Sequence, residues 1–261
     1  TAVRFAPAWE TGPIWEPIRV GPTVKMPPIK TRAKTDTLWK TAVVLPDCQI
    51  GYFRKEDETL EGTHDEKAIE IALAITKDAK PDVIVLVGDN LDFPEFSTKY
   101  ITTAPYQRTT QASIDRATLF GAQLRAAAPH ARIIWIAGNH EERLPRAIAQ
   151  NAAAAFGLRR GNLPDSFPVL SVPFLCRFDE PEINITYLAG YPASMYWINE
   201  RLRVIHGDKV NSNGVTASKY LAREKVSVLY GHIHRREWAE ITRQDHDGPR
   251  TVLAASPGCL A

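Results

Sequence analysis

Five groups of polar residues along the chain contain the residue types that bind metal ions, and each group directly follows an apolar stretch. In order, the groups are Asp47-Cys48-Gln49, Gly88-Asp89-Asn90-Leu91-Asp92, Gly138-Asn139-His140-Glu141, His206-Gly207-Asp208 and Gly231-His232-Ile233-His234. A single group of this kind is typical of a turn, because Gly, Asp and Asn are favoured there. Their repetition after successive apolar stretches instead predicts one shared site.

The residue types in these groups indicate the kind of site. Carboxylates, amide oxygens and imidazoles form a mixed oxygen and nitrogen ligand set, without the arranged thiolates of a structural zinc site. Such a set suits Mn, Fe, Zn or Ni. The ligands outnumber those of a closed tetrahedral site, and Asp89 can bridge through both carboxylate oxygens, so we expect two ions about 3.5 to 4 Å apart. A hydroxide between the ions is then the natural nucleophile.

The elements that must position these groups alternate between strands and helices in the first half of the chain. Apolar runs predict buried strands over residues 41–45, 83–87 and 132–137, and periodicity predicts helices over 65–79, 107–127 and 141–157. In the second half we expect strands over 185–188, 202–205, 226–230, 238–241 and 251–254, and a helix over 215–224. Alternation at this spacing predicts βαβ units and a partly parallel sheet. In such sheets the carboxyl ends of the strands hold ligands.

The first predicted helix has a specific expected orientation. Ala68, Ile71, Ala72, Ile75 and Ala79 share one face, which we expect to be buried, and the preceding aspartate at position 65 is the expected N-cap.

In this order, the polar groups resemble the signature of the calcineurin-like metallophosphoesterase superfamily. That signature reads Asp-x-His, Gly-Asp-x-x-Asp, Gly-Asn-His-Glu, His and Gly-His-x-His, and all blocks but the first match between Leu45 and His234. The resemblance implies an α/β fold, a four-layer α/β/β/α sandwich of two packed mixed sheets flanked by helices.

The resemblance also implies a role for each residue. It places Asp47, Gln49, Asp89 and His234 on one metal ion and Asp89, Asn139, His206 and His232 on the other, with Asp89 as the bridge. It assigns His140 to act on the leaving group, either as general acid or by stabilising the developing charge, and it assigns Asp92 to orient His140. Because His140 directly follows a ligand, its ring could project into the substrate space without binding metal.

The first block departs from the signature, because Gln49 stands where the family has histidine. Glutamine coordinates through its carbonyl oxygen, a harder donor than imidazole, so this position should bind metal weakly and favour Mn²⁺ or Mg²⁺. We expect Mn²⁺ as the cofactor, with Fe, Zn, Ni and Mg as alternatives. The other interpretation is that water replaces Gln49 as the ligand.

Three residues near the groups have plainer interpretations than a catalytic one. Cys48 is expected to be a small buried filler rather than a thiolate nucleophile, since nothing nearby would lower its pKa. We expect His64 at the surface or in a capping role. Glu141 is expected to complement the N-terminus of the helix that it begins.

The substrate is the least determined part of the prediction. Arg143, Lys209 and Arg235 could contact phosphate beside the metal ions. The segment 52–54 could line a base pocket or pack as an ordinary loop. We expect hydrolysis of phosphodiester bonds in nucleotides or nucleic acid, by in-line attack of the bridging hydroxide with His140 assisting the leaving group. The alternatives are a phosphomonoesterase, acting on protein or small molecules, and a catalytically weak metal-binding scaffold.

Composition excludes some classes of protein and limits the choice among the others. The formal net charge of +2 gives no overall field that would favour nucleic acid or membranes. No apolar run approaches the roughly 20 residues of a membrane span, and the 3 cysteines form no disulfide framework, so we expect a cytoplasmic protein without a membrane partner. Residues 1–36 are rich in proline and are expected to form an extended arm, followed by one metallophosphoesterase domain over 37–261. Because the chain lacks an initial Met and ends abruptly, we also expect it to be trimmed.

Overall fold

The structure is a computed structural model that describes residues 40–97, 103–211, 215–246 and 248–261. The predicted arm over residues 1–36 lies outside the described residues. Within these ranges, no helix combines the length and the apolar character that crossing a membrane requires.

The first sheet is built from short apolar strands. In spatial order these are β1 (Ala42–Leu45), β4 (Val83–Leu86), β5 (Arg132–Ile136) and β6 (Ile185–Leu188). All three neighbouring pairs are parallel. Runs such as Val-Ile-Val-Leu in β4 are apolar on both faces because packed layers cover both faces of this sheet.

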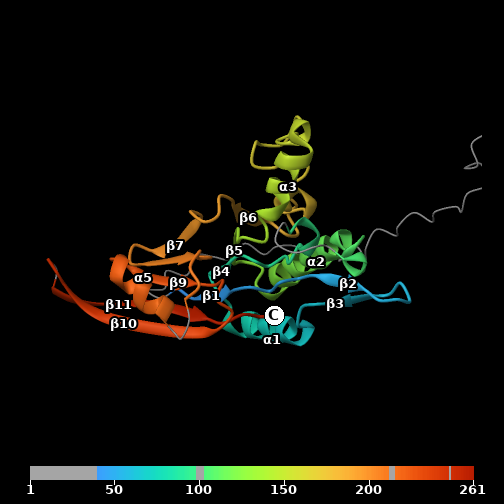
Figure 1. Cartoon of the computed structure of the whole chain (residues 1–261). Helices are drawn as coiled ribbons and strands as arrows, with labels where there is room; N and C mark the ends of the chain where they lie inside the picture. The colour runs from blue at the N-terminus through green and yellow to red at the C-terminus, as the bar shows by residue number, and fades with distance from the viewer. Residues whose placement is uncertain (1–39, 98–102, 212–214, 247) are drawn as a thin grey trace, which may run out of the picture.

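The second sheet is mixed and ends in a long hairpin. Its strands, in spatial order, are β10 (Arg236–Asp245), β11 (Gly248–Pro257), β9 (Ser227–Tyr230), β8 (Leu202–Ile205) and β7 (Met195–Asn199). Strand β9 pairs in parallel with both β11 and β8, whereas the β10–β11 and β7–β8 pairs are antiparallel. The hairpin extends beyond the body of the protein (Figure 1).

Three apolar clusters separate the layers. One joins the sheets face to face and contains Val85, Val87, Ile134 and Ile136 from the first sheet and Val204 from the second. Another covers the outer face of the first sheet with α1 (Glu66–Ala79) and α2 (Thr110–Ala127), and the third packs α5 (Val215–Arg223) on the second sheet. The predicted four-layer sandwich is therefore confirmed, although the first sheet is parallel and only the second is mixed (Figure 1).

Helix α1 confirms its predicted cap but not its predicted face. The Asp65 side chain accepts a hydrogen bond from the Ala68 backbone N–H. Ile71 and Ile75, which were expected inside, are exposed. The buried stripe instead runs through Ile69, Ala72 and Thr76. Two overlapping apolar stripes exist on this helix, and only contact with the sheet selects between them.

The helix predicted over 141–157 is shorter and is interrupted. Helix α3 spans Arg143–Asn151, and a separate 3₁₀ turn, η4, covers Ala153–Ala155. Ala152 between them has an extended φ of −145°, which breaks the helical path despite the high helix propensity of alanine. Helix α2 likewise begins at Thr110 rather than at residue 107.

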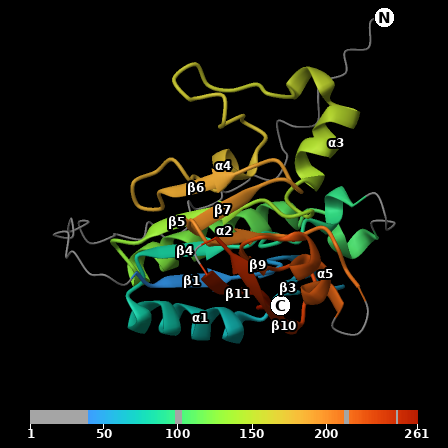
Figure 2. The same ribbon diagram turned by 90° about the vertical axis from the view of Figure 1, so that its left-hand side faces the viewer.

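Several elements carry no clear periodicity and were not predicted. They are the β2–β3 hairpin (Tyr52–Arg54 and Leu60–Gly62), strand β7, the 3₁₀ turns η2 (Pro94–Phe96) and η3 (Ala104–Tyr106), and the one-turn helix α4 (Val172–Leu175). Helix α3 and the segment after it project away from the sheets in both ribbon views (Figure 2).

Candidate metal centre

The predicted ligands gather at the carboxyl edges of both sheets. The loop after β1 lies directly against the loop after β4, because the backbone N–H of Asp47 donates to Gly88 O (3.2 Å) and that of Gln49 donates to Asp89 O (2.9 Å). The loop after β9 joins them where His232 N–H donates to the Asp47 carboxylate (3.0 Å to Oδ2). Hydrogen bonds between the loops, made by the backbone and by the Asp47 carboxylate, therefore hold the site together.

The backbone is strained at most of the predicted ligands. Five of them have positive φ angles: Asp47 (49°), Gln49 (42°), Asp89 (49°), His232 (70°) and His234 (51°). For residues other than glycine this conformation costs roughly 1 to 2 kcal/mol each. Such strain persists only where the surroundings over-determine it, and it concentrates at functional sites.

The glycines of two motifs make room for carboxylates. A Cβ atom at Gly138 would collide with the Asp89 side chain, and one at Gly231 would lie 2.6 Å from Asp47 Oδ2. Each motif thus depends on its glycine because a carboxylate of another motif occupies the space that a side chain would need.

Glu141 holds these loops together from behind. Its fully buried carboxylate accepts hydrogen bonds from the backbone N–H groups of Asp89, Asn90 and Gly138 at 2.8 to 2.9 Å. A longer one comes from Leu91 N–H (3.2 Å). The prediction that Glu141 complements a helix N-terminus is wrong, because its side chain points inward, away from α3. Sequence reasoning missed this role, although its place in the Gly-Asn-His-Glu block was the signal.

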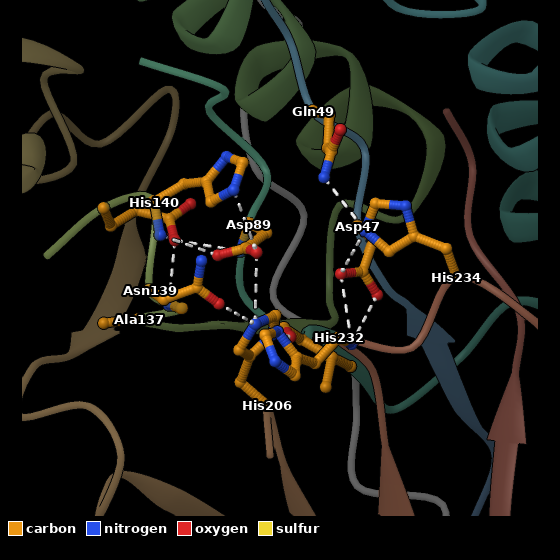
Figure 3. A network of polar contacts seen from close by, with 12 residues as sticks. Asp47, Gln49, Asp89, Ala137, Asn139, His140, His206, His232 and His234 are labelled. Carbon is orange, nitrogen blue, oxygen red and sulfur yellow. Dashed lines mark hydrogen bonds and ion pairs between the residues drawn. The ribbon is translucent and has the colours of Figure 1, made fainter. Parts of the chain in front are cut away.

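Four of the predicted ligands form a compact set, which we call the Asp89 group: Asp89 and His206, which are buried, and Asn139 and His232, which are partly buried. Asp89, His206 and His232 each offer a donor atom within 4.8 Å of the others (Figure 3). Asn139 Oδ1 lies 3.1 Å from His206 Nε2, and Asp89 Oδ2 lies 3.2 Å from the same nitrogen. The oxygen and nitrogen donors converge as a divalent ion requires.

The His206 ring is fixed for coordination. Its Nδ1 lies 2.7 Å from Val87 O, so Nδ1 carries the proton that it donates to this carbonyl and Nε2 faces the group. A histidine held in this way presents a ligand nitrogen in a set tautomer and orientation. The residues of the Asp89 group therefore fit a divalent ion.

Electrostatics within the Asp89 group favour positive charge. Burial opposes ionisation, but the facing imidazoles of His206 and His140 hold the pKa of Asp89 below its usual range. Burial likewise opposes charge on His206, yet attraction to the Asp89 carboxylate raises the pKa of His206 to about 9. Burial and the adjacent His206 lower the pKa of His232. A divalent ion would replace the proton that Asp89 and His206 hold between them.

The other predicted ligands form a looser set, which we call the Gln49 group: Asp47, Gln49 and His234. His234 Nε2 lies 3.4 Å from Asp47 Oδ1, and contact with that carboxylate raises the pKa of His234. Gln49 Nε2 lies 2.9 Å from the same ring nitrogen. The amide nitrogen rather than the carbonyl oxygen of Gln49 thus faces the group, so coordination would require the amide to turn over.

His140 and Asp92 lie together at the edge of the Asp89 group. His140 Nδ1 lies 3.0 Å from Asp92 Oδ1. Its Nε2 lies 3.6 Å from Asp89 Oδ2 (Figure 3). The His140 backbone N–H donates to Asp89 Oδ1 (2.8 Å), which ties the position of the ring to the group. The Asp92 carboxylate thus lies beside the imidazole at ion-pair distance, although His140 Nδ1 makes no hydrogen bond there.

The three cations predicted to contact phosphate have other partners in the structure. Arg143 donates to Asp92 O at 2.7 Å and therefore braces the loop that carries Asp92. Arg235 donates to Asn211 O and lies 3.2 Å from Glu237 Oε2. Lys209 is exposed beside Asp208 (3.1 Å). The geometry supports a bracing role for Arg143 more than a phosphate contact.

Three residues near the metal centre, Cys48, His64 and Tyr52, had plainer expected roles. Cys48 is fully buried, and burial raises the pKa of its thiol, which agrees with a filler. The surface prediction for His64 is wrong, because His64 is buried with Nδ1 3.0 Å from Gly51 O and Nε2 2.8 Å from Glu66 Oε1. Tyr52 packs its ring edge-on against His64, as in ordinary packing.

Tyr191 is a residue of this region that no sequence signal indicated. The centroid of its ring lies 5.7 Å from that of the His206 ring. Burial, and to a lesser extent the nearby carboxylates of Asp208 and Asp89, raises the pKa of the Tyr191 phenol. It stands in the loop after β6, which carries no polar motif of the kind found after the other strands. Only the tertiary structure brings it to the site.

The chain matches the family model for calcineurin-like phosphoesterases over residues 43–236. This range includes all the predicted metal ligands together with His140 and Asp92. No curated protein matches the chain.

Proposed function

The chain belongs to the calcineurin-like phosphoesterase family, and on that premise we propose that it hydrolyses phosphodiester bonds in nucleotides or nucleic acid with two divalent ions. Family membership makes it a metal-dependent phosphoester hydrolase. The observation that carries the rest is the Asp89 group, whose buried donors converge beside an oriented His140.

Different residues would bind the metal ions and act on the leaving group. Asp89, Asn139, His206 and His232 would hold one ion, and the Gln49 group with Asp89 would hold the other. When bound, the ions would activate water and neutralise the charge on the phosphate oxygens. We assign Mn²⁺ to the centre because the Gln49 amide, once turned over, would offer an oxygen donor.

His140 would act on the oxygen that leaves phosphorus. Its Nδ1 faces the Asp92 carboxylate, which leaves the Nε2 side of the ring toward the metal ligands. A protonated imidazole there can donate to the departing oxygen as general acid or stabilise its charge.

The diester assignment is tested by comparing substrates. The purified chain is assayed with Mn²⁺ on bis-p-nitrophenyl phosphate, p-nitrophenyl phosphate, cyclic nucleotides and labelled single- and double-stranded DNA. We expect the diesters to be turned over faster than the monoester. Much faster turnover of the monoester would make the protein a phosphomonoesterase, and folded protein without any turnover would make it a metal-binding scaffold.

A further inference from the structure

A cavity of about 220 Å³ lies between α3, the segment that follows it and the end of β6. Its walls are mostly apolar and include Pro145, Ile148, Leu170 and Pro173. An apolar cavity with a few polar groups is the usual form of a small-molecule site.

The cavity adjoins the Asp89 group along the backbone. Glu142 lines it three residues after Asn139, and Glu142 N–H donates to Gly138 O (3.3 Å) in the turn that carries His140. On the other side, Ala189 lines it two residues before Tyr191, whose ring packs on His206. The cavity therefore lies beside the turn that carries Asn139 and His140.

Tyr187 supplies the first polar group of the cavity. Its side chain lies deep in the protein, where burial raises the pKa of the phenol well above its ordinary value, yet part of its surface is open to the cavity. No residue in the described ranges hydrogen-bonds to its hydroxyl. A hydroxyl at the wall of a cavity is available to form a hydrogen bond to a bound molecule.

Glu142 supplies the second polar group. It occupies the N-cap position of α3, but its side chain makes no capping hydrogen bond. Its closest cation is Arg146, with Nε 3.9 Å from Glu142 Oε1, which is beyond hydrogen-bond distance. The Glu142 carboxylate thus makes a long ion pair but no capping hydrogen bond, and it can accept hydrogen bonds from a ligand.

We propose that this cavity binds the nucleobase of the substrate, specifically a base with an exocyclic amine. The apolar walls pack on the ring, the Glu142 carboxylate accepts from the amine, and the Tyr187 hydroxyl bonds to a ring nitrogen or carbonyl. The proposal rests on the proposed phosphodiesterase function. A purely aliphatic ligand would leave both polar groups without partners, so its chemistry fits less well.

The test compares two esters that release the same p-nitrophenol with Mn²⁺ present. One is adenosine 5′-(p-nitrophenyl phosphate), and the other is methyl p-nitrophenyl phosphate, which has no base. The quantity measured is the ratio of their kcat/KM values. Tyr187→Phe and Glu142→Met should each lower this ratio by about 3- to 10-fold, the worth of one hydrogen bond. Leu170→Trp, which fills the cavity from an exposed position, should lower it at least as much.

Leu119→Trp is the matched control, because Leu119 is similarly exposed but lies on α2, away from the cavity. It should leave the ratio unchanged. A ratio that stays constant in all three cavity variants would overturn the proposal, as would an equal loss on both esters. If the unmodified chain turns over neither ester, the proposed function fails by itself. Binding of adenosine is then followed by saturation-transfer NMR, and equal binding by the unmodified chain and Leu170→Trp would overturn the cavity proposal.

Discussion

The Asp89 group and the Gln49 group both draw residues from the carboxyl edges of the two sheets but differ in how firmly they are held. The His206 side chain is 1% exposed and is oriented by a backbone carbonyl, whereas the His234 side chain is 40% exposed and lies beside Asp47 and Gln49. The Asp89 backbone is held by Glu141, while Gln49 presents its amide nitrogen to the centre.

This difference has a chemical consequence. A preorganised group loses little conformational freedom when it binds an ion, so its affinity is high. A group that must turn an amide over and order an exposed histidine binds more weakly. We therefore expect the Asp89 group to fill first and the Gln49 group to hold the exchangeable ion.

The largest expected effect comes from replacing one carboxylate of each group in turn. Asp89→Asn removes the ligand that both ions would share, so activity with Mn²⁺ should fall by about 10⁴-fold or more. Metal analysis should find neither ion. Asp47→Asn, the matched variant in the Gln49 group, should retain about one ion per chain. Loss of both ions from Asp47→Asn would show that the groups do not bind independently.

A second prediction concerns the residue beside the Asp89 group that is not expected to bind metal. His140→Ala should lower kcat by about 100-fold or more, because general acid assistance is lost. Metal content should stay the same, and the loss should be greater for substrates with poor leaving groups. His130→Ala changes an exposed histidine and is the control. If His140→Ala also loses metal, His140 is a ligand.

A third prediction strengthens the weaker group. Gln49→His should tighten metal binding there by about tenfold and shift its preference from Mn²⁺ toward Zn²⁺, because imidazole is the softer donor. Metal competition followed by elemental analysis measures both effects. Gln150→His, on the exposed surface of α3, should change neither. An unchanged metal profile in Gln49→His would remove Gln49 from the ligands.

The smallest expected effect concerns the Glu66 carboxylate and its partners Arg116 and His64, of which His64 also contacts Gly51. Hydrogen bonds from Arg116 and then from His64 hold the pKa of Glu66 at about 2, below its ordinary 4.5. A lowered carboxyl pKa contributes stability above pH 4.5 that is lost as the pH falls toward 2. Because the Glu66 side chain is 52% exposed, solvent screening keeps this contribution small.

Glu66→Gln should therefore lower Tm by about 1 to 2 °C at pH 7 and by less at pH 3. Thermal unfolding followed by circular dichroism measures both values. Glu70→Gln, on the exposed face of α1, is the control. A Tm difference that grows toward low pH would contradict the assignment of the shift to Glu66.

Much of the architecture could be predicted because buried strands appear in the sequence as apolar runs. The apolar runs before Asp89 and Asn139 are central strands with mostly buried side chains, since a central parallel strand must be apolar on both faces. The run before Asp47 is an edge strand that is only partly buried. The hairpin at Tyr52–Arg54 was missed because its strands are short and only partly buried, so they have no apolar run.

The sequence by itself determined which residues meet at the candidate metal centre, because polar residues at the ends of parallel strands must share one edge. Only the tertiary structure decided how each is held. It buried Glu141 against two loops, placed His64 behind Gly51, and turned the Gln49 amide nitrogen toward His234. It also selected the Ile69 stripe of α1 over the Ile71 stripe. These outcomes depend on contacts between segments far apart in the chain, which no local pattern encodes.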